Sequence, residues 1–551
     1  MSIILDGHSL TATQVVRVAR EKDGDGKWLQ VSIADSAKQA LQHARQYVVN
    51  HWLKEGAQPI YGFNTGLGRL KDTAIPVEHI RLFQKMLVHA HSASVGEPFS
   101  EEVVRATLML RVNALIRGYS GPRLQTVQRL LEMLNRGVHP VIPQIGSVGA
   151  SGDLSPLAYM VGCLVGHSNA EAFFEGQRMP AQAALEKAGI LPVEFELEAK
   201  DGLALINGTA VSLAVGVMAA ENARKAVDNA DIALALSLEA MRCETTPFDP
   251  RVQAARPHHG QIQVARNVRA LIEGSQRCTE SARQVLLPDD LHVSHQTIPN
   301  RVQDAYSLRC APQVHGPVRD ALAYIDGILT TEINSATDNP LIFRREDGEY
   351  DVLSQGNFHG QYVAQAMDLL SLAVADLGSI SERRIYRMLD PTMSYGLPSN
   401  LVAKLMGVNY GYAIAHSSMA AIVTENKTLC WPASVDSIPT KGNQEDHVSN
   451  STWCARKART IVDNVLQIIS TEYLIAAQAI SVTDEHLSGF QMGKGTGTAF
   501  NAIRAKIPAA LAGDRWLHAD MVVALELVKN DSVKLDVEQS IGFNLSSPDF
   551  A

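Results

Sequence analysis

Long stretches without helix-breaking residues are the feature that most constrains what this chain can fold into. Residues 443–488 contain neither glycine nor proline, and residues 361–390 and 318–339 each contain a single glycine. Residues 193–246 contain no proline. Because glycine and proline are the residues that interrupt helices, these stretches favour helices longer than the usual globular length. They predict a mainly α protein with a bundle of long helices after about residue 200.

The first 200 residues have a mixed pattern instead. Helical patterns at 37–53 and 101–116 alternate with turn-rich loops at 61–68 and 140–156. We therefore expect a mixed N-terminal domain at 1–200, and at 201–551 a central bundle of long helices with a C-terminal helical segment. Parts of the bundle, such as 213–217 and 369–374, are apolar on nearly every side. Such helices must be buried by neighbours or by other subunits, so we expect an oligomer.

Charge and composition exclude several classes of protein. The 551 residues carry a net charge of −9, which argues against broad nucleic-acid binding or docking on an anionic membrane. No uninterrupted apolar run approaches the roughly 18 residues of a membrane span. The first ten residues lack the pattern of a signal peptide, and no two of the six cysteines have C-x-x-C spacing. We expect a cytoplasmic protein with no metal site.

The segment around Ala150-Ser151-Gly152 is the one that carries a distinctive chemistry. It lies within GSVGASGD at 146–153, a run of small residues that predicts a tight loop. In such a loop the Gly152 nitrogen can attack the Ala150 carbonyl carbon. Loss of two waters, one of them carrying the Ser151 hydroxyl, then leaves a conjugated 4-methylidene-imidazol-5-one. Glycine permits the strained backbone, alanine leaves room for closure, and serine supplies the departing hydroxyl. A tight loop without chemistry is the alternative.

This segment resembles the signature of the histidine and aromatic amino-acid ammonia-lyases and aminomutases, which make such an electrophile from their own Ala-Ser-Gly. The resemblance continues, in the family's order, through YGFNTG at 61–66, LINGT at 205–209, QDAYSLRC at 303–310, GNFHG at 356–360 and NQEDH at 443–447. It implies the long helical bundle of the fumarase/aspartase-like lyase superfamily, with the prosthetic group on the mixed N-terminal domain. It also implies a homotetramer without an external cofactor, in which three chains build each site.

The resemblance assigns catalytic roles within these blocks. Tyr61 is the expected base for the β-hydrogen of the substrate, while Asn207 and Tyr306 hold the electrophile and the bound amino acid. For Tyr61 to ionise near neutral pH its pKa must fall, and positive helix N-termini around the site could lower it. The expected catalytic residues are Tyr61, Ala150, Ser151, Gly152, Asn207 and Tyr306.

A second group of residues is expected to bind the substrate. A planar guanidinium suits the substrate carboxylate, and the family's carboxylate-binding arginine corresponds to Arg309. The carboxylate of Glu445 can accept an imidazole N–H, whereas beside a phenyl ring it would be an unpaired charge. The expected substrate-binding residues are His91, Gln303, Arg309, Phe358 and Glu445.

The identity of the substrate depends on signals that disagree. Glu445 and His91 resemble the histidine lyases and predict elimination of ammonia from L-histidine to give trans-urocanate. The sequences GQYV at 360–363 and GLPSN at 396–400 depart from typical histidine lyases, and GQY resembles aromatic lyases and aminomutases. The alternatives are therefore a lyase for tyrosine, phenylalanine or a substituted aromatic amino acid, and a 2,3-aminomutase. A non-catalytic scaffold with the same fold is a third hypothesis.

Overall fold

The computed structural model describes residues 2–287 and 301–547, and it is mainly α-helical, as predicted. Two compact units are present. The first comprises Met1–Ala219, Ile325–Asp368 and Pro432–Arg459, and the second comprises Ala220–Tyr324, Leu369–Trp431 and Thr460–Ala551. This division differs from a single boundary near residue 200, because two later segments return to the first unit. The composition of a segment does not reveal where the chain folds back.

Most of the first unit is built from short helices and short strands. Its helices are α1 (Ala12–Arg20), α2 (Asp35–Trp52), α3 (Ile80–His91), α4 (Glu101–Leu115), α5 (Leu124–Arg136), α6 (Leu154–Leu164), α7 (Ala181–Lys187), α8 (Asp201–Ile206) and the start of α9 (Ala210–Ala240). The 3-10 turns η1 (Gly68–Leu70), η2 (Val77–His79) and η6 (Lys441–Asn443) also belong to it.

The strands of this unit form small separate sheets. They are β1 (Ile3–Leu5), β2 (Val31–Ile33), β3 (Val95–Pro98), β4 (His139–Pro140), β5 (Pro143–Ile145), β6 (Glu171–Phe174), β7 (Gln177–Pro180), β8 (Leu341–Arg344) and β9 (Tyr350–Leu353). β1 pairs with β2 in parallel; β3 with β5, β8 with β9, and the order β4-β6-β7 are antiparallel. The pairing of β3 with β5 matters for function, because the Ala-Ser-Gly loop follows directly after β5.

Helix α4 is the centre of the first unit. Every residue from 103 to 115 in this helix is buried, including Arg105 and Arg111. Arg111 donates from Nε to the carbonyl oxygen of Ala204 at 3.0 Å, near the end of α8. A fully buried guanidinium has to be bound by acceptors, and here the acceptor is a helix-end carbonyl that lacks a partner within its helix. Arg111 therefore fixes the end of α8, which leads into the site.

The second unit contains the remainder of the long helices. Its elements are most of α9, η3 (Thr246–Phe248), α10 (Pro250–Ala254), α11 (His259–Leu271), α12 (Glu280–Arg283), α13 (Tyr306–Arg309), most of α14 (Ala311–Ile333) and α15 (Gln361–Leu389), η5 (Ser399–Leu401), α16 (Ala413–Leu429), most of α17 (Ser451–Val482), α18 (Asp484–Leu487), α19 (Lys494–Lys506), α20 (Leu517–Lys529) and α21 (Ser532–Ile541).

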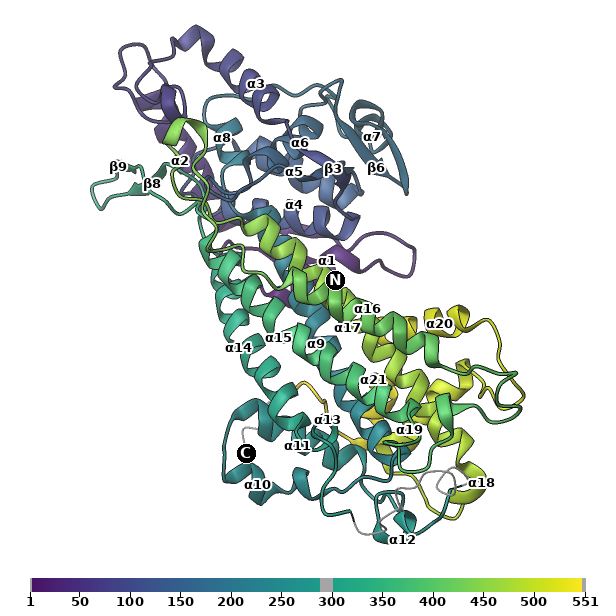
Figure 1. The fold of residues 1–551 in the computed structure, drawn as a ribbon. Coiled ribbons are helices and arrows are strands. Elements are labelled where there is room, and N and C mark those ends of the chain that lie inside the picture. The colour runs from purple at the N-terminus through teal and green to yellow at the C-terminus, as the bar shows by residue number, and fades with distance from the viewer. Residues whose placement is uncertain (1, 288–300, 548–551) are drawn as a thin grey trace. The chain divides into compact units, whose positions relative to one another are not determined.

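Within this unit α9, α14, α15 and α17 run alongside one another (Figure 1). Buried side chains join them: Ser237 of α9 donates to Glu472 of α17 at 2.7 Å, and Arg384 of α15 contacts the same carboxylate at 2.5 Å. The predicted stretch at 361–390 coincides with α15, whereas α17 begins at Ser451, eight positions after the start of the stretch at 443. The residues before it form the loop that carries Glu445. The long-helix prediction is therefore confirmed, although α17 begins later than the stretch without glycine and proline.

Helices α15 and α17 are long and apolar enough, by length and composition, to cross a membrane. Of their most apolar segments, 61% and 83% respectively is buried inside the protein. Core helices of bundles meet the same criteria, so these two helices are weak indications of a membrane span.

Candidate active site

The Ala150-Ser151-Gly152 segment lies in the loop between β5 and α6, and it is held very tightly. Gly152 has a φ of +67°, a conformation that favours glycine. A Cβ atom on Gly152 would coincide with the backbone of Gly208, which forms a bridge with Gly152. The N–H of Asp153 donates to the carbonyl oxygen of Gly208 at 2.7 Å. The loop that precedes α6 therefore packs in direct backbone contact, through Gly152, with Gly208 in the turn that follows α8.

Asp153 ties this loop to two long helices. Its Oδ2 accepts the N–H groups of Val211 and Ser212 at 3.0 and 2.8 Å, at the start of α9. Its Oδ1 accepts the hydroxyls of Thr452 at 2.7 Å and Ser147 at 3.1 Å. Complete burial raises the pKa of Asp153, and these hydrogen bonds oppose the rise. A carboxylate at a helix N-terminus with this many donors serves as an anchor for the loop.

Asn207 contacts the middle residue of the loop directly. It ends α8, is buried, and donates from Nδ2 to the carbonyl oxygen of Ser151 at 2.9 Å. The Oδ1 atom of Asn207 is buried without a hydrogen-bond partner in the described part of the chain. Buried amide oxygens are nearly always satisfied, and an exception beside this loop indicates a place for a further donor.

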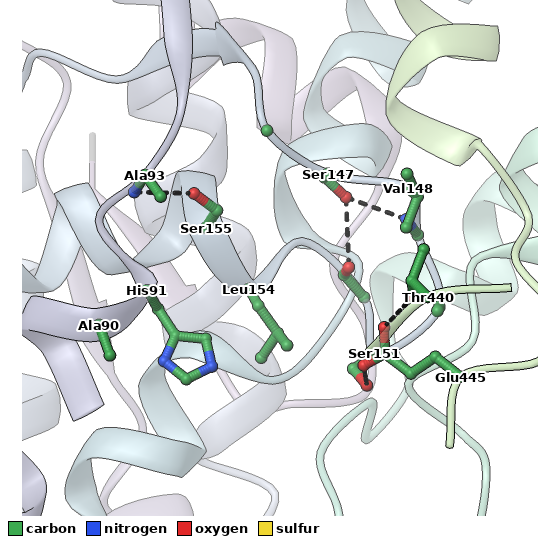
Figure 2. A pocket seen from close by; sticks show the side chains of 14 residues that line it. Ala90, His91, Ala93, Ser147, Val148, Ser151, Leu154, Ser155, Thr440 and Glu445 are labelled. Atoms are coloured by element: carbon green, nitrogen blue, oxygen red, sulfur yellow. Dashed lines mark hydrogen bonds between the residues drawn. The ribbon is translucent and has the colours of Figure 1, made fainter. Parts of the chain in front are cut away.

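The Ser151 hydroxyl faces a carboxylate from a distant part of the sequence. It donates to Oε1 of Glu445 at 2.7 Å, and the Thr440 hydroxyl donates to Oε2 of the same residue at 3.0 Å. The backbone N–H of Thr440 also donates to the Glu445 carbonyl oxygen at 2.8 Å. Figure 2 shows Ser151, Thr440 and Glu445 meeting at one side of the cavity. The loop 440–445 is therefore folded back on itself in a way that aims the carboxylate at Ser151.

Two adjoining cavities open onto this loop. The smaller, of about 250 Å³, is lined by loop residues together with His91, Thr440 and Glu445. The larger, of about 770 Å³, is lined by Tyr61, His91, Asn207, Phe358 and Glu445 as well as Ser151. Every residue that lines either cavity belongs to the first unit. The structure thus brings eight of the predicted site residues together: Tyr61, His91, Ala150, Ser151, Gly152, Asn207, Phe358 and Glu445.

His91 is the last residue of α3 and is half-buried. Its Nδ1 lies 2.8 Å from the carbonyl oxygen of Leu87. Because a carbonyl oxygen can only accept, Nδ1 carries the hydrogen of that bond, and Nε2 is an acceptor in the neutral ring.

Tyr61 is half-buried, and its hydroxyl oxygen accepts the N–H of Gly68 at 3.3 Å. Burial raises the pKa of Tyr61 above its ordinary value, the nearby carboxylates of Glu445 and Asp338 raise it further, and the Gly68 hydrogen bond opposes them. The lowered pKa expected from the sequence is therefore wrong for the chain by itself. Burial is the largest cause, and the carboxylates of Glu445 and Asp338 add to it because a negative neighbour disfavours a phenolate.

Three predicted residues belong to the second unit. Tyr306 and Arg309 lie on the short helix α13, and Gln303 precedes it. The Arg309 guanidinium lies over the Tyr306 ring at 4.5 Å from its centroid, and the Tyr306 side chain is exposed. The structure does not place these three residues in the same unit as the Ala-Ser-Gly loop.

Further cavity residues were not singled out from the sequence. His359 and His447 line the larger cavity, with ring centroids 5.3 Å apart. Burial lowers the pKa of His359, and the proximity of His447 contributes to this. Both lie in the blocks GNFHG and NQEDH, so their position in those blocks was the available signal. Within residues 2–287 and 301–547, no cluster of three or more histidine, cysteine or acidic side chains is arranged to hold a metal ion.

Of the sequences that depart from typical histidine lyases, Gly360 contacts the Ala-Ser-Gly loop, because its N–H donates to the carbonyl oxygen of Gly149 at 3.0 Å. Gln361 donates from Nε2 to the carbonyl oxygen of Ser434 at 3.0 Å, and Tyr362 is exposed. Gln361 and Tyr362 do not line either of the two cavities at Ser151. Asn400 lies in the second unit. Of these departures, Gly360 is the one that contacts the loop before Ser151.

Comparison with known proteins agrees with this geometry. Residues 10–505 match the family model described as aromatic amino acid lyase. The chain belongs to the aromatic amino acid lyase family. It is 45% identical to a histidine ammonia-lyase from Caldanaerobacter subterraneus subsp. tengcongensis, over 97% of both chains. The enzymes of this family that these comparisons name are carbon–nitrogen lyases and aminomutases, and the predicted family and enzyme class are confirmed.

Solved structures of other lyases and aminomutases share this fold. A histidine ammonia-lyase from Trypanosoma cruzi matches with a TM-score of 0.83 at 39% identity, covering 98% of this chain and 95% of that one. A tyrosine aminomutase from Streptomyces globisporus matches with a TM-score of 0.89 at 34% identity, covering 99% and 100%. The chain is more similar in sequence to the histidine ammonia-lyase, whereas its backbone is more similar to that of the tyrosine aminomutase. The lyase fold by itself therefore does not decide the substrate, which has to be argued from side chains.

Proposed function

We propose that this lyase eliminates ammonia from L-histidine to give trans-urocanate. The observation that carries the proposal is the Glu445 carboxylate, which lies at the Ser151 hydroxyl and lines both cavities. An imidazole N–H offers a donor to such a carboxylate, whereas a phenyl ring would leave it desolvated without compensation. The 45% identity to a protein named histidine ammonia-lyase supports the same substrate.

The loop residues fit a prosthetic group made from the chain itself. A 4-methylidene-imidazol-5-one at 150–152 would supply an electrophilic carbon at the position of Ser151 Cβ, to which a substrate amine can add. Gly152 has no Cβ and is pressed against Gly208, as ring closure through its nitrogen requires. Asn207 Nδ2 already holds the Ser151 carbonyl oxygen, and the partnerless Oδ1 beside it has room for a donor.

The remaining residues have roles that follow from their positions. Tyr61 would accept the β-hydrogen of the substrate at its phenolate oxygen. Because nearby carboxylates and burial raise its pKa, Tyr61 needs positive charge, and the substrate ammonium supplies it once bound. Neutral His91 would accept a substrate N–H at Nε2, and Asn207 would donate to the oxygen where negative charge collects.

A homotetramer would explain why three predicted residues belong to the other unit. Tyr306 is 69% exposed, and Arg309 has a buried Nε without a partner among the described residues. Exposed aromatic rings at Tyr324, Tyr362 and Trp431 lie on or beside the long helices and suit subunit contacts. We propose that α13 and the segment just before it in one chain contribute Tyr306, Arg309 and Gln303 to the cavity of another.

The cytoplasm is the proposed compartment. All six cysteines are free thiols, which suits a reducing environment.

The test is product analysis by mass spectrometry after incubation with L-histidine, L-tyrosine and L-phenylalanine in parallel. Urocanate from histidine, with the other two at least about tenfold slower, is the expected result. A β-amino acid product would instead indicate an aminomutase, and a cinnamate from tyrosine or phenylalanine an aromatic lyase of other specificity. Ser151→Ala protein is the matched control, because it lacks the hydroxyl that ring formation must expel.

A further inference from the structure

The carboxyl group of Glu445 contacts the hydroxyl oxygen of Ser151, which is the side-chain oxygen that has to leave when the prosthetic group forms. The Ser151 Oγ and Glu445 Oε1 atoms are 2.7 Å apart, and Thr440 holds the other carboxyl oxygen at 3.0 Å (Figure 2). Hydroxide is a poor leaving group, so the departure of a serine hydroxyl as water needs a proton delivered to Oγ. Of the two atoms in this contact, Oε1 is the one that can carry such a proton.

The neighbouring carboxyl group of Asp153 is not placed for this task. Its oxygens are occupied by the N–H groups of Val211 and Ser212 and by the hydroxyls of Ser212, Thr452 and Ser147. Within the described residues, the Ser151 hydroxyl is hydrogen-bonded to Glu445 and not to Asp153. Asp153 follows Gly152 directly in sequence, yet the geometry selects the carboxyl group that is 294 positions away.

We propose that Glu445 is the proton donor that removes the Ser151 hydroxyl during self-processing of the chain. This inference rests on the proposed imidazolone, because it concerns how that group is made. The proton on Oε1 passes to Oγ as the Cβ–Oγ bond breaks, and one water leaves. The Cα–H bond of Ser151 breaks in the same elimination, its electron pair forms the Cα–Cβ double bond, and its proton passes to a solvent water. Glu445 then regains a proton from solvent, so the net change is loss of one water.

Glu445 would thereby act twice at one place. While the serine is intact, Oε1 contacts the hydroxyl; after dehydration Ser151 no longer donates to it, and the imidazole N–H of the substrate takes that position. Thr440 is the positioning residue in both stages, because its hydroxyl binds Oε2.

The test follows the mass of the newly made chain and needs no substrate. The protein is produced by cell-free synthesis, and intact mass is recorded at intervals on material that elutes with the parent on size-exclusion chromatography. Glu445→Gln keeps the size of the side chain and a hydrogen-bond donor, but it cannot transfer a proton. Asp446→Asn is the matched control, because it removes a neighbouring carboxylate that lines the same cavity.

The parent and Asp446→Asn are expected to lose two waters at the same rate, and Glu445→Gln to lose the second water at least about tenfold more slowly. Thr440→Val should slow the loss by a smaller factor, and Thr440→Ser should restore it. A Glu445→Gln chain that sheds both waters at the parent's rate would overturn the inference. A parent that never sheds two waters would overturn the proposed prosthetic group itself, so the two failures are distinguishable.

Discussion

Two carboxylates in this lyase show how a structural site and a proposed reactive site differ. In the second unit, Glu472 is completely buried and each of its oxygens is occupied: Oε1 accepts from Ser237 and Arg384, and Oε2 from Ser381 and Arg384. In the first unit, Glu445 is half-buried at a cavity wall, and one of its donors is the Ser151 hydroxyl, which the proposed ring formation would remove.

The two carboxylates differ in whether their hydrogen-bond partners change during the proposed chemistry. The four contacts of Glu472 come from α9 and α15, and nothing in the chemistry changes them. Such a closed network fixes helices against one another, and removal of one member leaves a buried charge without compensation. Both oxygens of Glu445 accept hydroxyls at the cavity wall, Oε1 that of Ser151 and Oε2 that of Thr440. Under the proposed function, the donor at Oε1 is exchanged for one from the substrate. The comparison predicts opposite consequences for substitutions in the two places.

The largest effect is expected for Ser151→Ala. Without the hydroxyl no second water can leave, so turnover should fall below detection and the variant should lose at most one of the two waters from its own encoded mass. The melting temperature should change little, because among the described residues the hydroxyl's hydrogen-bond partner is the half-buried Glu445 side chain. Ser155→Ala is the control, since Ser155 lines the smaller cavity and binds Ser94 rather than Glu445. Turnover of histidine by Ser151→Ala would eliminate the loop as the electrophile.

Tyr61→Phe should lower kcat by roughly a hundredfold to ten-thousandfold, which is the usual contribution of a positioned base. The ring should still form, because the Tyr61 hydroxyl contacts the Gly68 N–H and not Ser151. Intact mass and histidine turnover measured on the same preparation separate these two effects. Substantial turnover in this variant would assign the base to another residue of the larger cavity.

Glu472→Gln tests the other side of the comparison. It leaves the buried Arg384 guanidinium without its ion pair, which should lower the free energy of unfolding by about 3–5 kcal/mol. Urea unfolding of the parent and the variant measures this, with Ser151→Ala as the contrasting control. The processed mass should be that of the parent. A loss of less than about 1 kcal/mol would mean that the closed network contributes little, and the distinction drawn here would fail.

The sequence predicted the helices better than it predicted the site. Stretches without glycine and proline indicated α15 and the interior of α17, because breakers act locally. The contact between Ser151 and Glu445 joins residues 294 positions apart, and no local pattern reveals it; only resemblance to a family indicated both partners. The pKa of Tyr61 was predicted in the wrong direction because it depends mainly on burial and then on Glu445 and Asp338, and both the burial and this proximity exist only in the folded chain.

Glu445→Gln should change the choice between substrates. A charge-assisted hydrogen bond to imidazole contributes about 1.5–3 kcal/mol, so the ratio of kcat/KM for L-histidine to that for L-phenylalanine should fall about tenfold to a hundredfold. The ratio is the right quantity, because incomplete processing of this variant lowers both activities equally. An equal fall in kcat/KM for both substrates would mean that Glu445 does not distinguish the imidazole from a phenyl ring.

The smallest expected signal is the ionisation of Tyr61 in the free protein. Burial and two carboxylates raise its pKa, so below that pKa each unit of decreasing pH removes nine-tenths of the remaining phenolate. The difference in tyrosinate absorbance between the parent and Tyr61→Phe should therefore stay near zero from pH 7 to pH 9, and kcat/KM should rise with pH across that range. A clear Tyr61 phenolate signal at pH 8 without substrate would contradict this. It would show that positive charge from outside the first unit reaches Tyr61, for example Arg309 of another chain, and that the site is prepared before the substrate binds.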